Sequence, residues 1–151
     1  MKEYLYDPHT HTAETSKCGH LPAAEVVDRY AGHGFSGLVV TDHLHPEYLS
    51  RIDVDHNWDH VMDHYLSGYH ASKARGDQVG LDVILGAELR FPENDNDYLV
   101  YGIDEYGTDA IDWLVAHKYM EWADQPYVVI DGAGPGLSLI HISEPTRQEA
   151  I

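Results

Sequence analysis

Basic residues are scarce in this chain, whose 151 residues include 9 Lys and Arg against 26 Asp and Glu, for a formal net charge of −17. Duplex DNA and anionic membranes attract proteins through basic patches, so this composition argues against both as partners. The sequence has no apolar run long enough to cross a bilayer, and its mean hydropathy is −0.40. Cations are therefore the natural counter-ligands.

Cysteine is nearly absent as well. Cys18 is the only one, which excludes an internal disulfide, and the first residues lack the apolar segment of a signal peptide. We therefore expect a reducing, cytoplasmic environment. The length and the 43% hydrophobic content suit one globular domain with a buried core.

Hydrophobic periodicity predicts alternating strands and helices. Continuous apolar runs indicate strands buried on both faces, and apolar stripes at helical spacing indicate amphipathic helices. We expect strands at 4–6, 37–41, 81–85, 98–103 and 127–130, and helices at 22–33, behind Asp55 or Asn57, and from 108 or 109 to 122. This order implies an α/β fold with mostly parallel strands, either closed as a barrel or open and doubly wound.

The pattern stops after Ile130. A glycine-rich stretch at 132–136 is followed by residues with no period that continues the alternation. We therefore predict a domain at 1–130 and interpret 131–151 as a tail that is non-native, such as read-through of vector DNA, or disordered.

Twelve histidines are the unusual feature of the composition, and several follow predicted strands. His9 and His11 come after the first strand and would point the same way in an extended segment, because side chains alternate with a period of two. His43 follows the second strand and Glu88 the third, at the edge where α/β folds build their sites. Imidazoles and carboxylates together suit Zn²⁺, Mn²⁺ or Fe²⁺ and predict a site for more than one ion.

Each of these residues also has a structural interpretation. His-x-His arises by chance in a histidine-rich chain, Asp42 could cap a helix, and Glu88 could pair with Arg90. Glu14 follows His9 and His11 and is a further candidate ligand, and His20 could take its place. Alternatively, His20 is a substrate-binding residue in a loop at 18–20 that covers the pocket. His56, His60 and His64 have helical spacing, but their acidic neighbours favour a solvated face.

Three motifs resemble the first three of the polymerase and histidinol phosphatase (PHP) superfamily, over roughly residues 3 to 130. They are Asp7-Pro-His9-Thr-His11-Thr, Thr41-Asp42-His43 and Gly86-Ala-Glu88. The resemblance implies a distorted (β/α)7 TIM-like barrel that holds two or three divalent ions, Zn, Mn or Fe with Mg as an alternative, and hydrolyses phosphate esters. It also implies a set of metal ligands: His9, His11, Glu14, His43 and, as the bridging carboxylate, Glu88.

The chain departs from the family after its last predicted strand. Members complete the site with a later His-Pro motif and a near-terminal Asp-x-His, whereas residues 131–134 read Asp-Gly-Ala-Gly and no Asp-x-His follows. We therefore expect the N-terminal part of the barrel only, a truncated chain, and weak or no turnover.

The resulting hypothesis is a metal-dependent phosphoesterase that acts on a small phosphorylated substrate. Arg90 is a candidate phosphate clamp, although a surface salt bridge is the commoner role for such a residue. Two alternatives stay open. One is an amidohydrolase-type enzyme, whose barrel also opens with His-x-His but typically uses a carbamylated lysine that has no counterpart after a predicted strand here. The other is a non-catalytic metal-binding PHP-like module.

Overall fold

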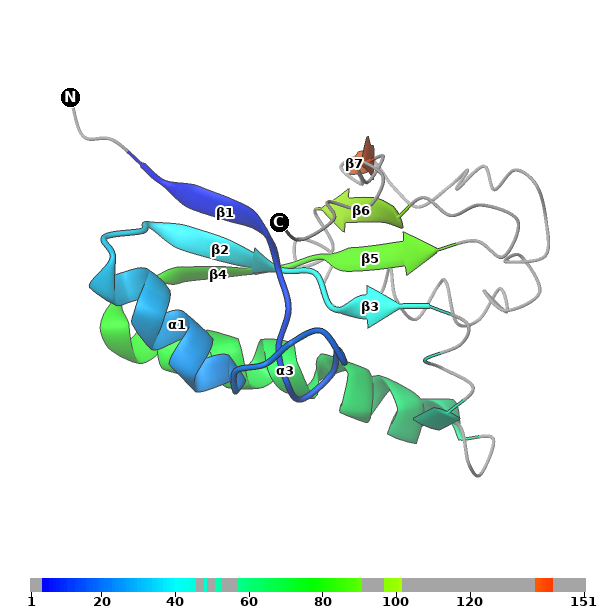
Figure 1. Ribbon diagram of the computed structural model, residues 1–151. Helices are drawn as coiled ribbons and strands as arrows, with labels where there is room; N and C mark the ends of the chain where they lie inside the picture. The colour runs from blue at the N-terminus through cyan, green and yellow to red at the C-terminus, as the bar shows by residue number, and fades with distance from the viewer. Residues whose placement is uncertain are drawn as a thin grey trace, which may run out of the picture.

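The structure is a computed structural model that describes residues 4–45, 48, 51–52, 57–90, 97–101 and 138–142. Two helices and seven strands form in these ranges, and the strands make two sheets (Figure 1). The first sheet is parallel, in the order β1–β2–β4, with bounds Tyr6–Thr10, Gly37–Val40 and Asp82–Leu85. The second has the order β3–β5–β6–β7, with bounds His43–Leu44, Ala87–Arg90, Asp97–Tyr101 and Ser138–Ile142.

The two sheets are joined through the adjacent strands β2 and β4 of the first sheet, which continue into β3 and β5, respectively, of the second. The parallel pairs β2–β4 and β3–β5 have the same register, because the partner residues differ by the same number of positions in both. Gly86 N–H donates to the carbonyl of Val40 at 2.8 Å, and Glu88 N–H donates to that of Asp42 at 3.2 Å, so the pairing continues across the break. The junction therefore brings the chain after β2 directly beside Glu88.

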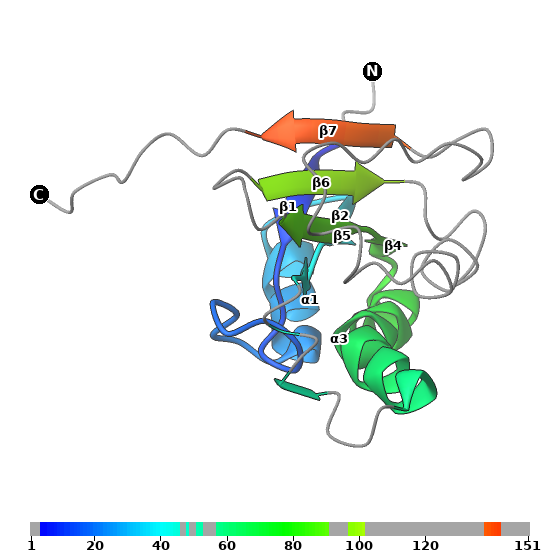
Figure 2. The same ribbon diagram turned by 90° about the vertical axis from the view of Figure 1, so that its right-hand side faces the viewer.

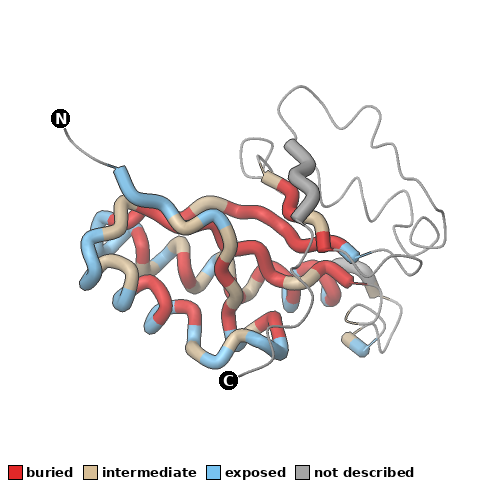
Figure 3. Tube along the Cα trace, turned by 45° about the horizontal axis from the view of Figure 1, so that its top comes forward, coloured by how far each residue is buried: buried red, intermediate tan, exposed pale blue. Residues whose placement is uncertain are grey.

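Helices α1 (Ala23–Gly32) and α3 (Trp58–Val79) contact each other and lie along the same side of the first sheet (Figure 2). In Figure 3 the central strand β2 and the inward faces of the helices are buried, whereas most of β1 is exposed or partly buried. One core cluster comprises Val26, Val27, Leu38, Val40, Leu81 and Val83. Burial of these side chains is the main source of stability in this part of the fold.

Two of the three predicted helices lie in the described residues, and both form with small shifts at their ends. Pro22 stands just before α1 rather than in its first turn, and the chain leaves that helix through Gly34, whose φ of +81° suits glycine. The sequence places Trp58, Val61, Met62, Tyr65, Leu66 and Tyr69 on one stripe of α3. Val61, Met62, Tyr65 and Leu66 are buried and Tyr69 is partly buried. Among the described residues no helix has the length and apolar character that a membrane crossing requires.

Several strand predictions need correction. The first strand extends to Thr10, so His9 lies within it and not in a following loop. Asp97, which precedes the strand expected at 98–103, is the first residue of β6, and β6 runs antiparallel to β5. Parallel pairing therefore holds only in the first sheet and between β3 and β5, and the described strands form two sheets rather than a closed barrel.

Other predictions fall on residues that the structure does not describe. The helix expected near 108–122 and the strand expected at 127–130 lie outside the described ranges. β7 belongs to the segment that we interpreted as a tail, and it pairs antiparallel with β6. The domain boundary near residue 130 and the origin of 131–151 stay predictions.

Candidate metal centre

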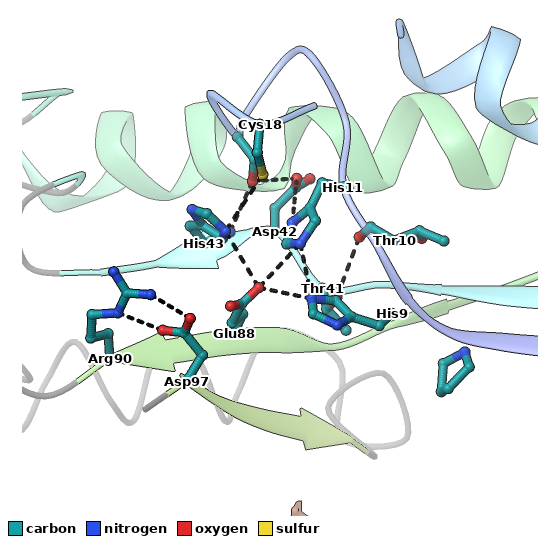
Figure 4. A network of polar contacts seen from close by, with 12 residues as sticks. His9, Thr10, His11, Cys18, Thr41, Asp42, His43, Glu88, Arg90 and Asp97 are labelled. Carbon is teal, nitrogen blue, oxygen red and sulfur yellow. Dashed lines mark hydrogen bonds and ion pairs between the residues drawn. The ribbon is translucent and has the colours of Figure 1, made fainter. Parts of the chain in front are cut away.

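Four of the predicted ligands converge where the two sheets join (Figure 4). His9 lies in β1 and His11 follows directly after that strand. His43 and Glu88 are register partners in the β3–β5 pair, so the backbone itself places these side chains together. The period-two argument for His9 and His11 predicts this convergence from the first strand, and their Nε2 atoms lie 2.9 Å apart.

One oxygen of Glu88 is the centre of the group. Its Oε2 lies 2.9 Å from Nε2 of His9, 3.1 Å from Nε2 of His11 and 3.4 Å from Nε2 of His43. Burial opposes the charge of this carboxylate, but hydrogen bonds with the three imidazoles outweigh burial and hold the pKa of Glu88 well below its usual range. A buried anion therefore faces three nitrogen ligands.

His45 extends the group, although we did not predict it as a ligand. Its ring stacks on that of His43 with centroids 4.4 Å apart, and it forms a potential ligand set with His43 and Glu88. Burial, followed by the nearby charge of His43, lowers the pKa of His45 to about 3. The imidazole is thus neutral, as metal ligation requires. The sequence could have identified His45 as a candidate ligand, because His43-x-His45 repeats the spacing of His9-x-His11.

Asp42 organises the loop beside the centre and caps no helix, which corrects the structural interpretation above. Its Oδ1 accepts hydrogen bonds from the backbone N–H of Thr12 at 2.8 Å and from Oγ of Ser16 at 2.7 Å, and its Oδ2 accepts one from Oγ1 of Thr12 at 2.7 Å. Burial raises the pKa of Asp42 despite these bonds. The carboxylate fixes residues 12–16 against the end of β2.

Glu14 is the one predicted ligand that the structure does not bring to the cluster. Both of its carboxylate oxygens accept from the backbone N–H of Ala23, at 2.9 and 3.0 Å. Ala23 is the first residue of α1, whose preceding Pro22 offers no side-chain cap. A carboxylate at this position satisfies an otherwise unpaired donor and complements the helix dipole.

Glu14→Ala should therefore destabilise the fold by about 1 kcal/mol, the usual cost of losing a helix cap, without weakening metal binding. Urea denaturation followed by circular dichroism measures the first effect, and a Zn²⁺ titration measures the second. A Zn²⁺ Kd that rises tenfold or more would return Glu14 to the ligand set.

Two pockets flank the cluster, and Cys18 lines both. One has a volume of about 340 Å³ and is lined by His9, His11 and the exposed His20, among others. His20 thus lies at the pocket where we expected a substrate-binding loop. Its role stays a prediction.

The second pocket is basic. It has a volume of about 270 Å³ and is lined by Ser16, Lys17, Cys18, His43, His45, Tyr48, Arg51 and Arg90. Arg90 forms a two-pronged ion pair with Asp97, one contact of which is 2.6 Å between Nε and Oδ1. Arg90 therefore makes the salt bridge that we expected and also borders the pocket.

The residues present fit a divalent ion. Three groups of possible ligands have their donor atoms within 4.8 Å of one another, and Glu88 belongs to two of these groups. Within the described part of the chain, Nδ1 of His11 and Nε2 of His45 are buried without a hydrogen-bond partner. Each of these nitrogens lies near a carboxylate oxygen instead, Oδ1 of Asp42 at 3.9 Å and Oδ1 of Asp97 at 3.6 Å. The fit to an ion therefore rests on the imidazoles that converge on Glu88.

The histidines of α3 do not join this group. His60 and His64 are exposed, as their acidic neighbours indicated. His56 lies outside the described residues.

Comparison with known proteins gives partial likenesses only. No protein family and no curated protein matches the chain. One similar structure is a protein of Bifidobacterium adolescentis assigned as a metal-dependent phosphoesterase, with 19% identity, a TM-score of 0.47, and coverage of 77% of this chain and 33% of that one. Another is an amidohydrolase from Chromobacterium violaceum with bound sulfate and no metal, with 20% identity, a TM-score of 0.47, and coverage of 74% and 32%.

The chain thus spans about a third of the length of these two proteins. At this level of similarity neither likeness assigns a family, and membership of the PHP superfamily stays a prediction.

Proposed function

We propose that this chain carries the metal centre of a metal-dependent phosphoesterase that acts on small phosphate esters. The observation that supports it best is the basic pocket beside the ligand cluster. Three of the nine basic residues of this acidic chain, Lys17, Arg51 and Arg90, line that pocket. His43 lines it too and is also a member of the ligand cluster.

The charges of these side chains suggest which residues bind metal and which bind phosphate. His9, His11, His43 and Glu88 would hold the ions, which supply Lewis acidity and a water of lowered pKa when bound. Lys17 and Arg51 would pair with the phosphate oxygens and orient the phosphorus toward the cluster. Arg90, held by Asp97, would keep its guanidinium in a fixed orientation at the edge of this pocket.

The basic pocket separates this proposal from its rivals. A neutral amide has no negative charge to attract Lys17 and Arg51, which line the pocket beside the Arg90–Asp97 ion pair, so the pocket favours a phosphorylated substrate over an amide. A module that binds metal without catalysis would have the same ligands, and only turnover distinguishes it.

The test combines binding and turnover with the full chain. We expect inorganic phosphate to bind the Zn²⁺- or Mn²⁺-loaded chain, and Arg51→Ala to raise its Kd by about tenfold, the loss of one charge-assisted hydrogen bond. Lys73→Ala is the matched control, because Lys73 is an exposed cation on α3 that pairs with Asp77. It should leave phosphate binding unchanged.

Turnover is measured with a chromogenic phosphate ester. We expect slow, metal-dependent hydrolysis that His11→Ala abolishes. Equal hydrolysis by both chains would contradict the assigned ligands. Phosphate binding without any turnover would instead select the non-catalytic module.

A further inference from the structure

The thiol of Cys18 lies against the ligand cluster on the side away from His9. Its Sγ is 3.6 Å from Nε2 of His43, and the rings of His43 and His11 meet edge to face with centroids 4.6 Å apart. One donor atom from each of Cys18, His11 and His43 lies within 4.8 Å of the others. We propose that Cys18 is a metal ligand that shares an ion with His11 and His43.

The spacing matches a coordination site. With Zn–S near 2.3 Å and Zn–N near 2.0–2.1 Å, tetrahedral geometry separates sulfur from nitrogen by roughly 3.5 Å. A direct contact between thiol and imidazole would give a similar distance, so a spectroscopic signature of the metal–sulfur bond is needed to separate the two.

The loop that carries Cys18 is fixed at several points. Oγ of Ser16 donates to Asp42 at 2.7 Å and accepts from the backbone N–H of His43 at 3.0 Å. Gly19 N–H donates to the carbonyl of Ser16 at 3.0 Å, and a Cβ on Gly19 would lie 2.3 Å from the carbonyl oxygen of Thr12. Cys18 is thus held between two fixed residues next to His43, and its thiol faces the two pockets beside the cluster.

A cysteine ligand changes which metals the site prefers. Thiolate is a soft ligand that favours Zn²⁺ and Co²⁺ over Mg²⁺ and Mn²⁺. Binding transfers the thiol proton to solvent and forms the metal–sulfur bond, so no oxidant or reductant is involved. The inference rests on the metal centre of the proposed function and is independent of its phosphate substrate.

The test is a Co²⁺ titration of the full chain followed by absorption spectroscopy. We expect a near-ultraviolet thiolate-to-cobalt charge-transfer band in the wild type that Cys18→Ser lacks, while both chains show the visible bands of bound Co²⁺. Glu14→Gln is the control from the same loop and should keep the charge-transfer band. Cys18→Ser should also raise the Zn²⁺ Kd by about 10- to 100-fold and leave the Mg²⁺ Kd nearly unchanged.

Alkylation gives a second readout on the same residue. Zn²⁺ should slow the reaction of Cys18 with iodoacetamide at least tenfold, and Mg²⁺ should not. Visible Co²⁺ bands without a charge-transfer band, together with an alkylation rate that Zn²⁺ does not change, would overturn the inference and leave the proposed function standing. A charge-transfer band in a chain that hydrolyses no phosphate ester would support the inference while the proposed function fails.

Discussion

Replacing Glu88 by Gln will raise the Zn²⁺ Kd of this chain by at least about 100-fold, beyond the 10- to 100-fold that changes to outer-shell partners cost. Gln preserves the size of the side chain and removes only the negative charge. That charge faces three imidazoles, because Oε2 of Glu88 lies within 3.4 Å of Nε2 of His9, His11 and His43. Competition against a chromophoric chelator measures the Kd.

Glu14→Gln is the matched control for this experiment. It removes a carboxylate in the same way, but the Glu14 side chain bonds to the backbone of Ala23 and does not join the cluster. Its Zn²⁺ Kd should stay within about twofold of the wild type. A Glu88→Gln variant that binds Zn²⁺ as well as the Glu14→Gln variant would show that the buried carboxylate is structural.

Gly68→Ala will destabilise the fold by about 2–4 kcal/mol. A Cβ at this position in α3 would lie 2.0 Å from Oγ1 of Thr12 and 3.0 Å from Oδ2 of Asp42. Thr12 is fully buried and held by its hydrogen bonds to Asp42, so it cannot turn away without breaking them. The cost of overpacking, about 1–3 kcal/mol, then adds to the cost of losing the hydrogen bond from Oγ1 of Thr12 to the carboxylate of Asp42.

Gly32→Ala is the control for this substitution. It lies in the last turn of α1, and a Cβ there would meet nothing within 4 Å. Alanine should be neutral or stabilise the chain by up to about 1 kcal/mol, because it reduces the backbone entropy of the unfolded state. Guanidinium denaturation of both variants measures the difference. Equal unfolding midpoints would mean that α3 does not press against the loop that carries the site.

The sequence predicts the elements whose pattern is local. Val26 and Val27 mark the buried face of α1, and the apolar run at 37–40 marks a strand buried on both sides. The antiparallel pairing of β5 with β6 is not encoded in this way. Asp97 has the polarity of a turn residue, and it becomes a strand residue because Arg90, its register partner across the pair, neutralises it.

The metal-binding site shows the same difference between residues placed by local sequence pattern and residues placed by long-range contacts. His9, His11, His43 and Glu88 could be predicted because each stands at or just after the end of an apolar strand, and strand ends meet at one edge of a parallel sheet. For Glu14, nothing in the neighbouring sequence reveals that the first N–H of α1 binds its carboxylate, and its role as a ligand stays a prediction. The position of Cys18 depends on a loop conformation fixed by Asp42, a long-range contact that periodicity does not report.

The central claim is that side chains from separate strands hold divalent ions together. Crystals grown with Mn²⁺ or Zn²⁺ and measured at the absorption edge of the metal test it most directly. We predict an anomalous peak about 2.0–2.3 Å from Nε2 of His9 and from the carboxylate of Glu88. Peaks confined to exposed histidines of α3, such as His60 and His64, with none between β1 and β5, would contradict it.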